Sequence, residues 1–253
     1  MIYEIVYGKE GTSDYKELAT PKECKGYVKS MFPMILELRY PSEAELTPKP
    51  VVFCYTKGRK CRAILSCIKW FAGRGGNYFA QHLVFENEDD LIVAGPAWLI
   101  KRRRFYIETL TDWSEREKEN TGKYSWKPII QPSDYCIGLE EKLEPHIDRI
   151  IEDIAKKWNG ADVQAKFVLL FDPSKQSDDY RLDLLYELYS RINKDKRWNY
   201  PFCTFDFQRS GWVSKPPPPK WDIVFVVDDD MKTRDYFTKH KYEPISLMKG
   251  NES

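Results

Sequence analysis

The chain has 253 residues, of which 42% are hydrophobic and 31% are charged, a balance typical of a folded protein rather than a disordered one. Its formal net charge is +1, so no overall field would hold it on DNA or on an anionic membrane. The sequence begins without a basic and apolar leader and contains no apolar run long enough to cross a bilayer. We therefore expect a cytoplasmic protein.

The first half of the sequence favours strands, which are expected at residues 2–7, 51–55, 61–70 and 78–85. The second and third of these form a predicted hairpin with Gly58 in its turn. Pro96 is placed to open a short helix. The charged and turn-rich residues 112–126 predict a surface excursion.

The second half alternates helices and strands. Apolar residues recur at helical spacing from Leu139 to Trp158, and Gly160 follows as a stop. Ser177 is a predicted N-cap for a second helix, which would bury Leu182, Leu185, Leu188, Tyr189 and Ile192. A third, short helix is expected at 231–240. Strands are predicted at 167–171, 202–207 and 223–227, and the prolines within 215–220 predict a stiff connector.

These elements predict an α+β fold, with a strand-rich N-terminal half packed against a small α/β C-terminal half. The expected lobes are 1–135, which carries a glycine-rich loop, and 136–253, and we expect them to be closely packed. The six cysteines are scattered and mostly lie in apolar runs, so they are expected to be buried and reduced. No metal or cofactor is predicted.

The glycine-rich loop is the most distinctive part of the sequence. Gly73, Gly76 and the polar residues Arg74 and Asn77 stand between two apolar runs, without the lysine and hydroxyl residue of a phosphate-binding P-loop. One interpretation is a tight structural turn in which Asn77 supplies hydrogen bonds. The other is a recognition site, in which backbone amides and the Arg74 guanidinium bind an anionic group.

Two further sets of residues could carry chemistry. His82 lies on the strand after the loop, where it is either structural or catalytic. A catalytic role would need a nucleophile or an orienting carboxylate, and Ser66, Cys67 and Glu86 are nearby in the sequence without forming a known signature with it. Asp172 and the run from Asp228 to Asp230 follow predicted strands, where carboxylates can bind Mg²⁺. Both sets leave open a hydrolase or nuclease as an alternative to a protein without catalytic activity.

A basic run at 101–104 precedes two aromatic residues. Arg102 and Arg103 could meet single-stranded nucleic acid, where rings stack on bases. The balanced total charge and the missing RNA-binding signatures favour a solvated helix face or a rim that contacts a protein partner.

Several short motifs resemble the N-terminal domain family of bacterial GTPase-associated proteins. Gly73-Arg74-x-Gly76-Asn77 runs into Phe79-Ala80-x-His82-Leu83, Gly95-Pro96-Ala97 and Trp113 follow as further landmarks, and Arg197-Trp198 precedes Thr204-Phe205. Gln81 stands where many members carry the first histidine of a pair, and Asp206-Phe207 replaces the usual Ser-Thr. The resemblance covers about residues 1–230.

The resemblance implies a role rather than a reaction. Members are inferred to be non-catalytic adaptors that are encoded beside GTPases, AAA-type ATPases or von Willebrand-type modules in bacterial conflict and anti-phage defence systems. We therefore expect an intracellular partner-binding subunit. Its candidate contact residues are Gly73, Arg74, Gly76, Asn77, His82, Arg102 and Arg103.

Overall fold

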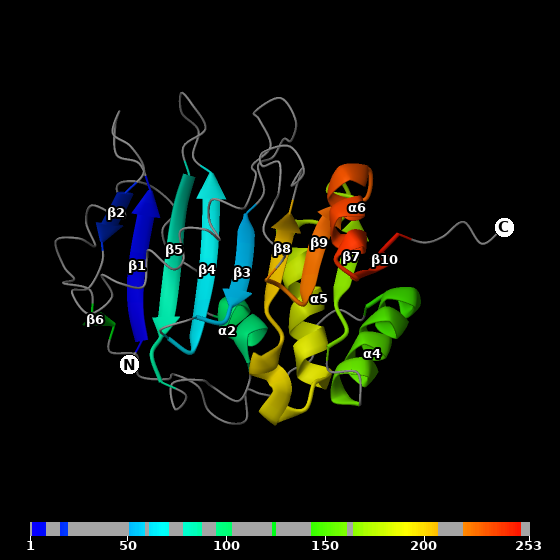
Figure 1. The fold of residues 1–253 in the computed structure, drawn as a ribbon, viewed down its shortest axis with the longest axis horizontal. Coiled ribbons are helices and arrows are strands. Elements are labelled where there is room, and N and C mark those ends of the chain that lie inside the picture. The colour runs from blue at the N-terminus through cyan, green and yellow to red at the C-terminus, as the bar shows by residue number, and fades with distance from the viewer. Residues whose placement is uncertain are drawn as a thin grey trace.

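The computed structural model describes a set of segments separated by gaps. These are residues 2–8, 16–19, 51–58, 61–70, 78–87, 95–102, 123–124, 143–160, 164–206 and 220–248. The described elements form one mixed sheet with helices on its faces (Figure 1). The predicted α+β class is therefore confirmed.

The strands of both halves belong to this single sheet. Their order is β10-β7-β9-β8-β3-β4-β5-β1-β2, and β6 pairs with β1 beside this path. The strands are β1 (Ile2–Gly8), β2 (Lys16–Ala19), β3 (Val52–Thr56), β4 (Ala63–Trp70), β5 (Tyr78–Phe85), β6 (Lys123–Tyr124), β7 (Phe167–Phe171), β8 (Phe202–Asp206), β9 (Ile223–Val227) and β10 (Glu243–Ser246). The described helices are α2 (Pro96–Arg102), α4 (Pro145–Asn159), α5 (Asp178–Arg191), the 3₁₀ helix η4 (Lys194–Asn199) and α6 (Met231–Lys239).

The N-terminal part of the sheet is antiparallel. β3 and β4 form the predicted hairpin, with Thr56 opposite Ile64. Gly58 follows β3, and a Cβ atom at this position would stand 2.1 Å from the Cys61 Sγ atom and 2.8 Å from its carbonyl oxygen. The hairpin therefore needs glycine here because the chain returns too closely for any side chain.

The C-terminal part is parallel and is covered on both faces. β7, β9 and β8 are neighbouring parallel strands, as are β10 and β7. In Figure 1, α5 crosses behind the sheet from β7 to β8, and α6 crosses in front from β9 to β10. Both crossovers are right-handed, as the twist of parallel strands requires. This coverage explains why β7 and β9 are apolar along their whole length and fully buried.

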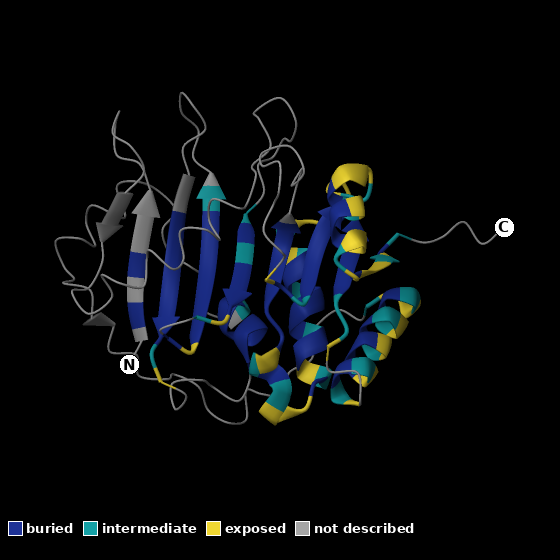
Figure 2. Cartoon of the chain, viewed as in Figure 1, coloured by how far each residue is buried: buried dark blue, intermediate teal, exposed yellow. Residues whose placement is uncertain are grey.

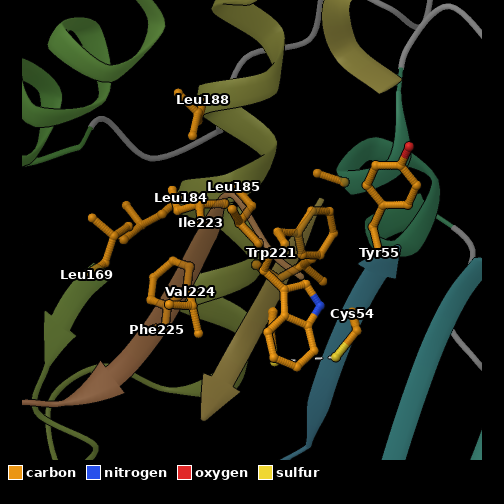
Figure 3. Close-up of a cluster of buried hydrophobic side chains, with 14 of the residues drawn as sticks. Cys54, Tyr55, Leu169, Leu184, Leu185, Leu188, Trp221, Ile223, Val224 and Phe225 are labelled. Carbon is orange, nitrogen blue, oxygen red and sulfur yellow. Dashed lines mark hydrogen bonds between the residues drawn. The ribbon is translucent and has the colours of Figure 1, made fainter. Parts of the chain in front are cut away.

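Leucines of α5 provide the packing against this parallel part. Figure 3 shows Leu184 and Leu185 beside Ile223 of β9, and Leu188, one turn further along the helix, is also fully buried. All five leucine, tyrosine and isoleucine positions predicted to be buried in or after this helix are buried. The Ser177 hydroxyl caps the helix by accepting a hydrogen bond of 3.1 Å from the Tyr180 amide, as predicted.

The helix α4 is shorter than its apolar pattern predicted. It begins at Pro145, so Leu143 precedes the helix even though it packs against the core. Proline fits the first helical turn, where its missing N–H group has no intrahelical partner. At the other end, Trp158 is fully buried, and its ring stacks on Tyr200 with the centroids 4.0 Å apart.

The two halves meet edge to edge rather than as stacked layers. β3 and β8 are antiparallel neighbours, and Cys54 lies opposite Cys203. This pairing, which we call the seam, is the contact between the strand-rich half and the small α/β half, and the sequence did not predict which strands would make it. Figure 2 shows the strands around the seam as mostly buried, whereas α4, α6, η4 and β10 carry exposed positions. Whether the lobes 1–135 and 136–253 are separate domains stays a prediction.

Several short elements escaped the sequence pattern. The strands β2 and β10 and the helix η4 have no clear apolar periodicity, and three of the four β10 residues are exposed. β6 lies inside the predicted excursion at 112–126, and the rest of that segment lies outside the described residues. So do the prolines of the predicted connector.

Candidate functional site

Most of the predicted contact residues cannot be placed in the structure. Gly73, Arg74, Gly76, Asn77 and Arg103 lie outside the described residues. The backbone of Arg102 ends α2, but its side chain is not among those described. A role for these six residues in recognition stays a prediction.

His82 lies in the interior of the sheet. It is on β5 between Ile5 of β1 and Ser66 of β4, and its exposed fraction is 0%. Its Nδ1 atom lies 2.7 Å from the Ser66 Oγ atom, and its Nε2 atom has no hydrogen-bond partner among the described residues. His82 can therefore contribute to a binding surface only through the strand that carries it.

The surroundings of His82 determine its protonation state. Burial lowers the pKa of this imidazole to about 3, because a charged ring would lose its hydration without gaining a counter-ion. The ring is therefore neutral at physiological pH. A histidine with so low a pKa is a weak general base, since catalytic bases have pKa values near the operating pH.

Ser66 and His82 have the distance expected of a nucleophile and its base, but not the access. Ser66 is 3% exposed, so neither side chain of the pair meets solvent to an extent that would admit a substrate. In this conformation the hydrogen bond joins β4 to β5 inside the sheet. The geometry thus favours the structural interpretation of His82 over the catalytic one.

Two thiols extend the same row of residues to the seam. Cys54 lies opposite Ser66 on one side and Cys203 on the other, and the Cys54 and Cys203 Sγ atoms are 3.3 Å apart. Both thiols are buried, as are those of Cys61 and Cys67. Burial raises the pKa of Cys67 to about 12, so this thiol stays protonated and is a poor nucleophile.

Two of the carboxylates at the strand ends are engaged in a turn and in a helix cap. Asp172 accepts hydrogen bonds from the amide and hydroxyl of Ser174 at 2.9 and 2.6 Å. Asp230 caps α6 through the amide and hydroxyl of Thr233 at 3.2 and 2.7 Å. Across the segments that the structure describes, no group of three or more His, Cys, Asp or Glu residues could hold a metal ion.

A charged cluster crosses the seam on the face covered by α5. The Asp178 carboxylate accepts a hydrogen bond of 2.7 Å from the Val51 amide, and it pairs with the Arg181 guanidinium. Arg181 is 2% exposed and also donates to the carbonyls of Thr204 and Gln176 at 2.9 and 2.7 Å. Burial raises the pKa of Asp178 and lowers that of Arg181, but together the pair is satisfied.

Lys101, the first residue of the basic run, contacts α5. Lys101 of α2 forms an ion pair with Asp183 of α5 and lies over the Tyr186 ring, 5.0 Å from its centroid. A cavity of about 480 Å³ lies beside it, between α2, α5 and the strands β3 and β4. Lys101 therefore contributes to packing within the chain.

The fold defines an α+β protein in which an antiparallel sheet continues into a parallel one. Residues 16–119 match the family model described as GTPase-associated protein 1, N-terminal domain type 2. The resemblance inferred from the sequence is confirmed over this segment, which includes the glycine-rich loop and His82.

Other comparisons add no relative. No curated protein and no solved structure matches the chain. Among the described residues, no helix has the length and apolar character needed to cross a membrane.

Proposed function

We propose that the protein is a non-enzymatic adaptor, a partner-binding subunit of a bacterial NTPase-linked conflict system that acts inside the cell against phage. The observation that carries this proposal is the match of residues 16–119 to the N-terminal domain of GTPase-associated protein 1. A name of this kind supports a functional link to a GTPase. The partner we propose is a GTPase, an AAA-type ATPase or a von Willebrand-type module.

The engagement of reactive side chains supports a binding role over a catalytic one. The Ser66–His82 pair is buried, and Asp172 and Asp230 are held in a turn and a helix cap. A catalytic site needs such groups to face a substrate. By contrast, a protein surface can recognise its partner with exposed side chains that need no shifted pKa.

The glycine-rich loop is the contact surface that we propose. Gly73 and Gly76 would shape the loop, and Arg74 and Asn77 would supply the polar contacts, because arginine is favoured in protein interfaces. Arg102 and Arg103, at and after the end of α2, would add charge at the rim. His82 would hold the strand that follows the loop.

A co-purification experiment tests this proposal. The tagged chain is mixed with a GTPase encoded by a neighbouring gene, loaded with GDP or with a non-hydrolysable GTP analogue, and retention is measured. The variants are Arg74→Ala/Asn77→Ala and, as a matched control, Arg149→Ala on the exposed side of α4. We expect the double variant to lose the partner while its melting temperature stays unchanged, and the control to retain it.

Two other outcomes would contradict parts of the proposal. A double variant that melts many degrees lower would mean that the loop is structural and that contacts lie elsewhere. If neither the wild type nor any variant retains a GTPase, an AAA-type ATPase or a von Willebrand-type protein, the adaptor function is wrong.

A further inference from the structure

A basic cavity lies at the edge of the sheet where the parallel strands begin. Its volume is about 670 Å³, within the range of about 300–1,000 Å³ of small-molecule sites. Lys166 directly precedes β7, and Asp222 directly precedes β9. Lys57 follows β3, so the cavity joins residues from both sides of the seam.

The charge of this cavity is strongly positive. Lys57, Lys166, Lys196 and Lys241 line it, together with the single carboxylate of Asp222. The Asp222 carboxylate lies 3.8 Å from the Lys166 Nζ atom. Within the part of the chain that the structure describes, no carboxylate lies within ion-pair distance of the other three lysines. Among the described residues, the cavity therefore gathers more positive charge than the Asp222 carboxylate can balance.

Hydrogen bonds hold part of the cavity wall in place. The Lys196 ammonium donates to the carbonyls of Trp158 and Asn159, at 3.3 and 2.9 Å, at the end of α4. His240 at the end of α6 has its Nδ1 atom 2.8 Å from the Tyr236 carbonyl, so this nitrogen carries the proton. The Nε2 atom of His240 has no partner among the described residues and is left for a ligand.

The backbone at Lys241 is a second and independent sign of function. This residue has a φ of 66°, in the left-handed region that favours glycine. Its amide donates to the Thr238 carbonyl at 3.0 Å, and the Tyr242 amide donates to the Phe237 carbonyl at 3.1 Å. These two bonds form a Schellman motif, in which the position of Lys241 is usually glycine. Here the helix instead ends on a lysine that lines the cavity, at a cost in backbone strain.

From this arrangement we propose that the cavity binds a small ligand bearing two or more linked phosphate groups. Lysines bind phosphate as compact point charges, and four of them around one cavity match several negative charges. The Tyr200 ring in its wall is stacked on Trp158 on one face and is only 2% exposed in all, so it offers no free face to a nucleobase. The phosphate groups, rather than a base, would therefore provide most of the binding. This site goes beyond the adaptor function and does not depend on it.

Inorganic tripolyphosphate is the probe that tests the proposal. Its affinity is measured by calorimetry at fixed ionic strength and pH 7.5, beside orthophosphate, GTP and ATP. We expect tripolyphosphate and the nucleotides to bind, and orthophosphate to bind far more weakly. Equal affinities for tripolyphosphate and GTP would identify the phosphates as the recognised chemistry, and tighter binding of one nucleotide would identify it as the source of those phosphates.

Lys241→Gly is the most informative variant because it separates binding from folding. Glycine relieves the left-handed strain, so we expect the melting temperature to rise while tripolyphosphate affinity falls about tenfold, the effect of losing one charge-assisted contact. Lys57→Gln should weaken binding similarly. Lys232→Gln is the matched control, since this exposed lysine is at the opposite end of α6, and it should bind like the wild type.

Asp222→Asn should have the opposite effect. This carboxylate faces Lys57, Lys166 and the other basic groups of the cavity, and it repels an anion when it is ionised. Burial raises the pKa of Asp222 to about 6, so the variant should bind several-fold more tightly than the wild type at pH 7.5. This difference should shrink at pH 5.5, where the wild-type carboxylate is mostly protonated, and protonation of the ligand affects both proteins equally. His240 lines the same cavity, so the comparison of the two proteins isolates the carboxylate.

Three results would overturn the proposal. The first is that the wild type binds neither tripolyphosphate nor nucleotide. The second is that Lys241→Gly and Lys57→Gln both bind with unchanged affinity. The third is that a single-stranded oligonucleotide binds more tightly than any small phosphate at the same ionic strength. The last result would indicate a nucleic-acid surface rather than a small-ligand cavity.

Discussion

Acidification should destabilise the protein through His82. The folded state holds this ring neutral, with a pKa lowered from 6.5 to about 3 by burial. The unfolded chain binds the proton first as the pH falls, so the stability contributed by the neutral ring is present above pH 6.5 and is lost towards pH 3. By linkage, the loss between pH 7 and pH 5 is about 2 kcal/mol, and by pH 4 it is about 3 kcal/mol.

The assay is urea denaturation of the wild type and of His82→Gln at pH 7 and pH 5. The difference in the free energy of unfolding between the two pH values should be about 2 kcal/mol smaller in the variant. Trp158→Phe serves as a control, because it destabilises the core and keeps His82. It should therefore lose as much stability on acidification as the wild type.

A spectroscopic measurement on the wild type avoids the risk that His82→Gln fails to fold. The chain has 3 histidines, so their ring signals can be separated by NMR and assigned with single variants. We expect the His82 signal to stay unchanged from pH 7.5 down to pH 4.5. A His82 ring that titrates near pH 6.5, or an equal pH dependence in the wild type and His82→Gln, would refute the argument.

Four substitutions test the packing in the same denaturation assay. Arg181→Ala should cost about 3 kcal/mol because it leaves the Asp178 carboxylate without its cationic partner. Asp178→Asn should cost less, since Arg181 keeps two carbonyl acceptors. Equal costs would contradict this explanation. Gly58→Ala should cost about 1–3 kcal/mol, because the new Cβ atom meets the Cys61 carbonyl oxygen at 2.8 Å, and a neutral effect would mean that the turn is not as tight as described. Trp158→Ala should cost about 3–5 kcal/mol, and a loss below 1 kcal/mol would show that the stacked pair is not part of the core.

The sequence predicts best those elements whose pattern is local. β7 and β9 are uninterrupted apolar runs, and α5 has both its leucine spacing and its Ser177 cap, so each was predicted close to its observed bounds. β10 pairs with β7 along its whole length although it carries exposed residues. Its position depends on pairing with β7, and the residues of β10 themselves carry no information about that partner.

The candidate sites show the same limit more strongly. Ser66 and His82 are 16 residues apart in the chain. They lie on β4 and β5, which follow one another in the chain, and the register of this strand pair brings them together. The basic cavity instead gathers Lys57, Lys196 and Lys241 from three distant elements. Lysines are common on protein surfaces, so no spacing in the sequence distinguishes these from the other basic residues. Only the left-handed backbone conformation distinguishes Lys241 from the other lysines, and this conformation can be recognised in the structure but not in the sequence.

The seam also predicts how residues 16–119, the segment that matches the family model, would behave as an isolated fragment. Within residues 16–119, β3 and β5 each lie beside a strand that this segment does not contain, namely β8 on one side and β1 on the other. A fragment cut to these limits would present two rows of unsatisfied backbone groups, which invite pairing between molecules. The matched segment is thus the middle of a larger sheet, and polymerisation of an isolated fragment would reflect its missing neighbours rather than the behaviour of the whole chain.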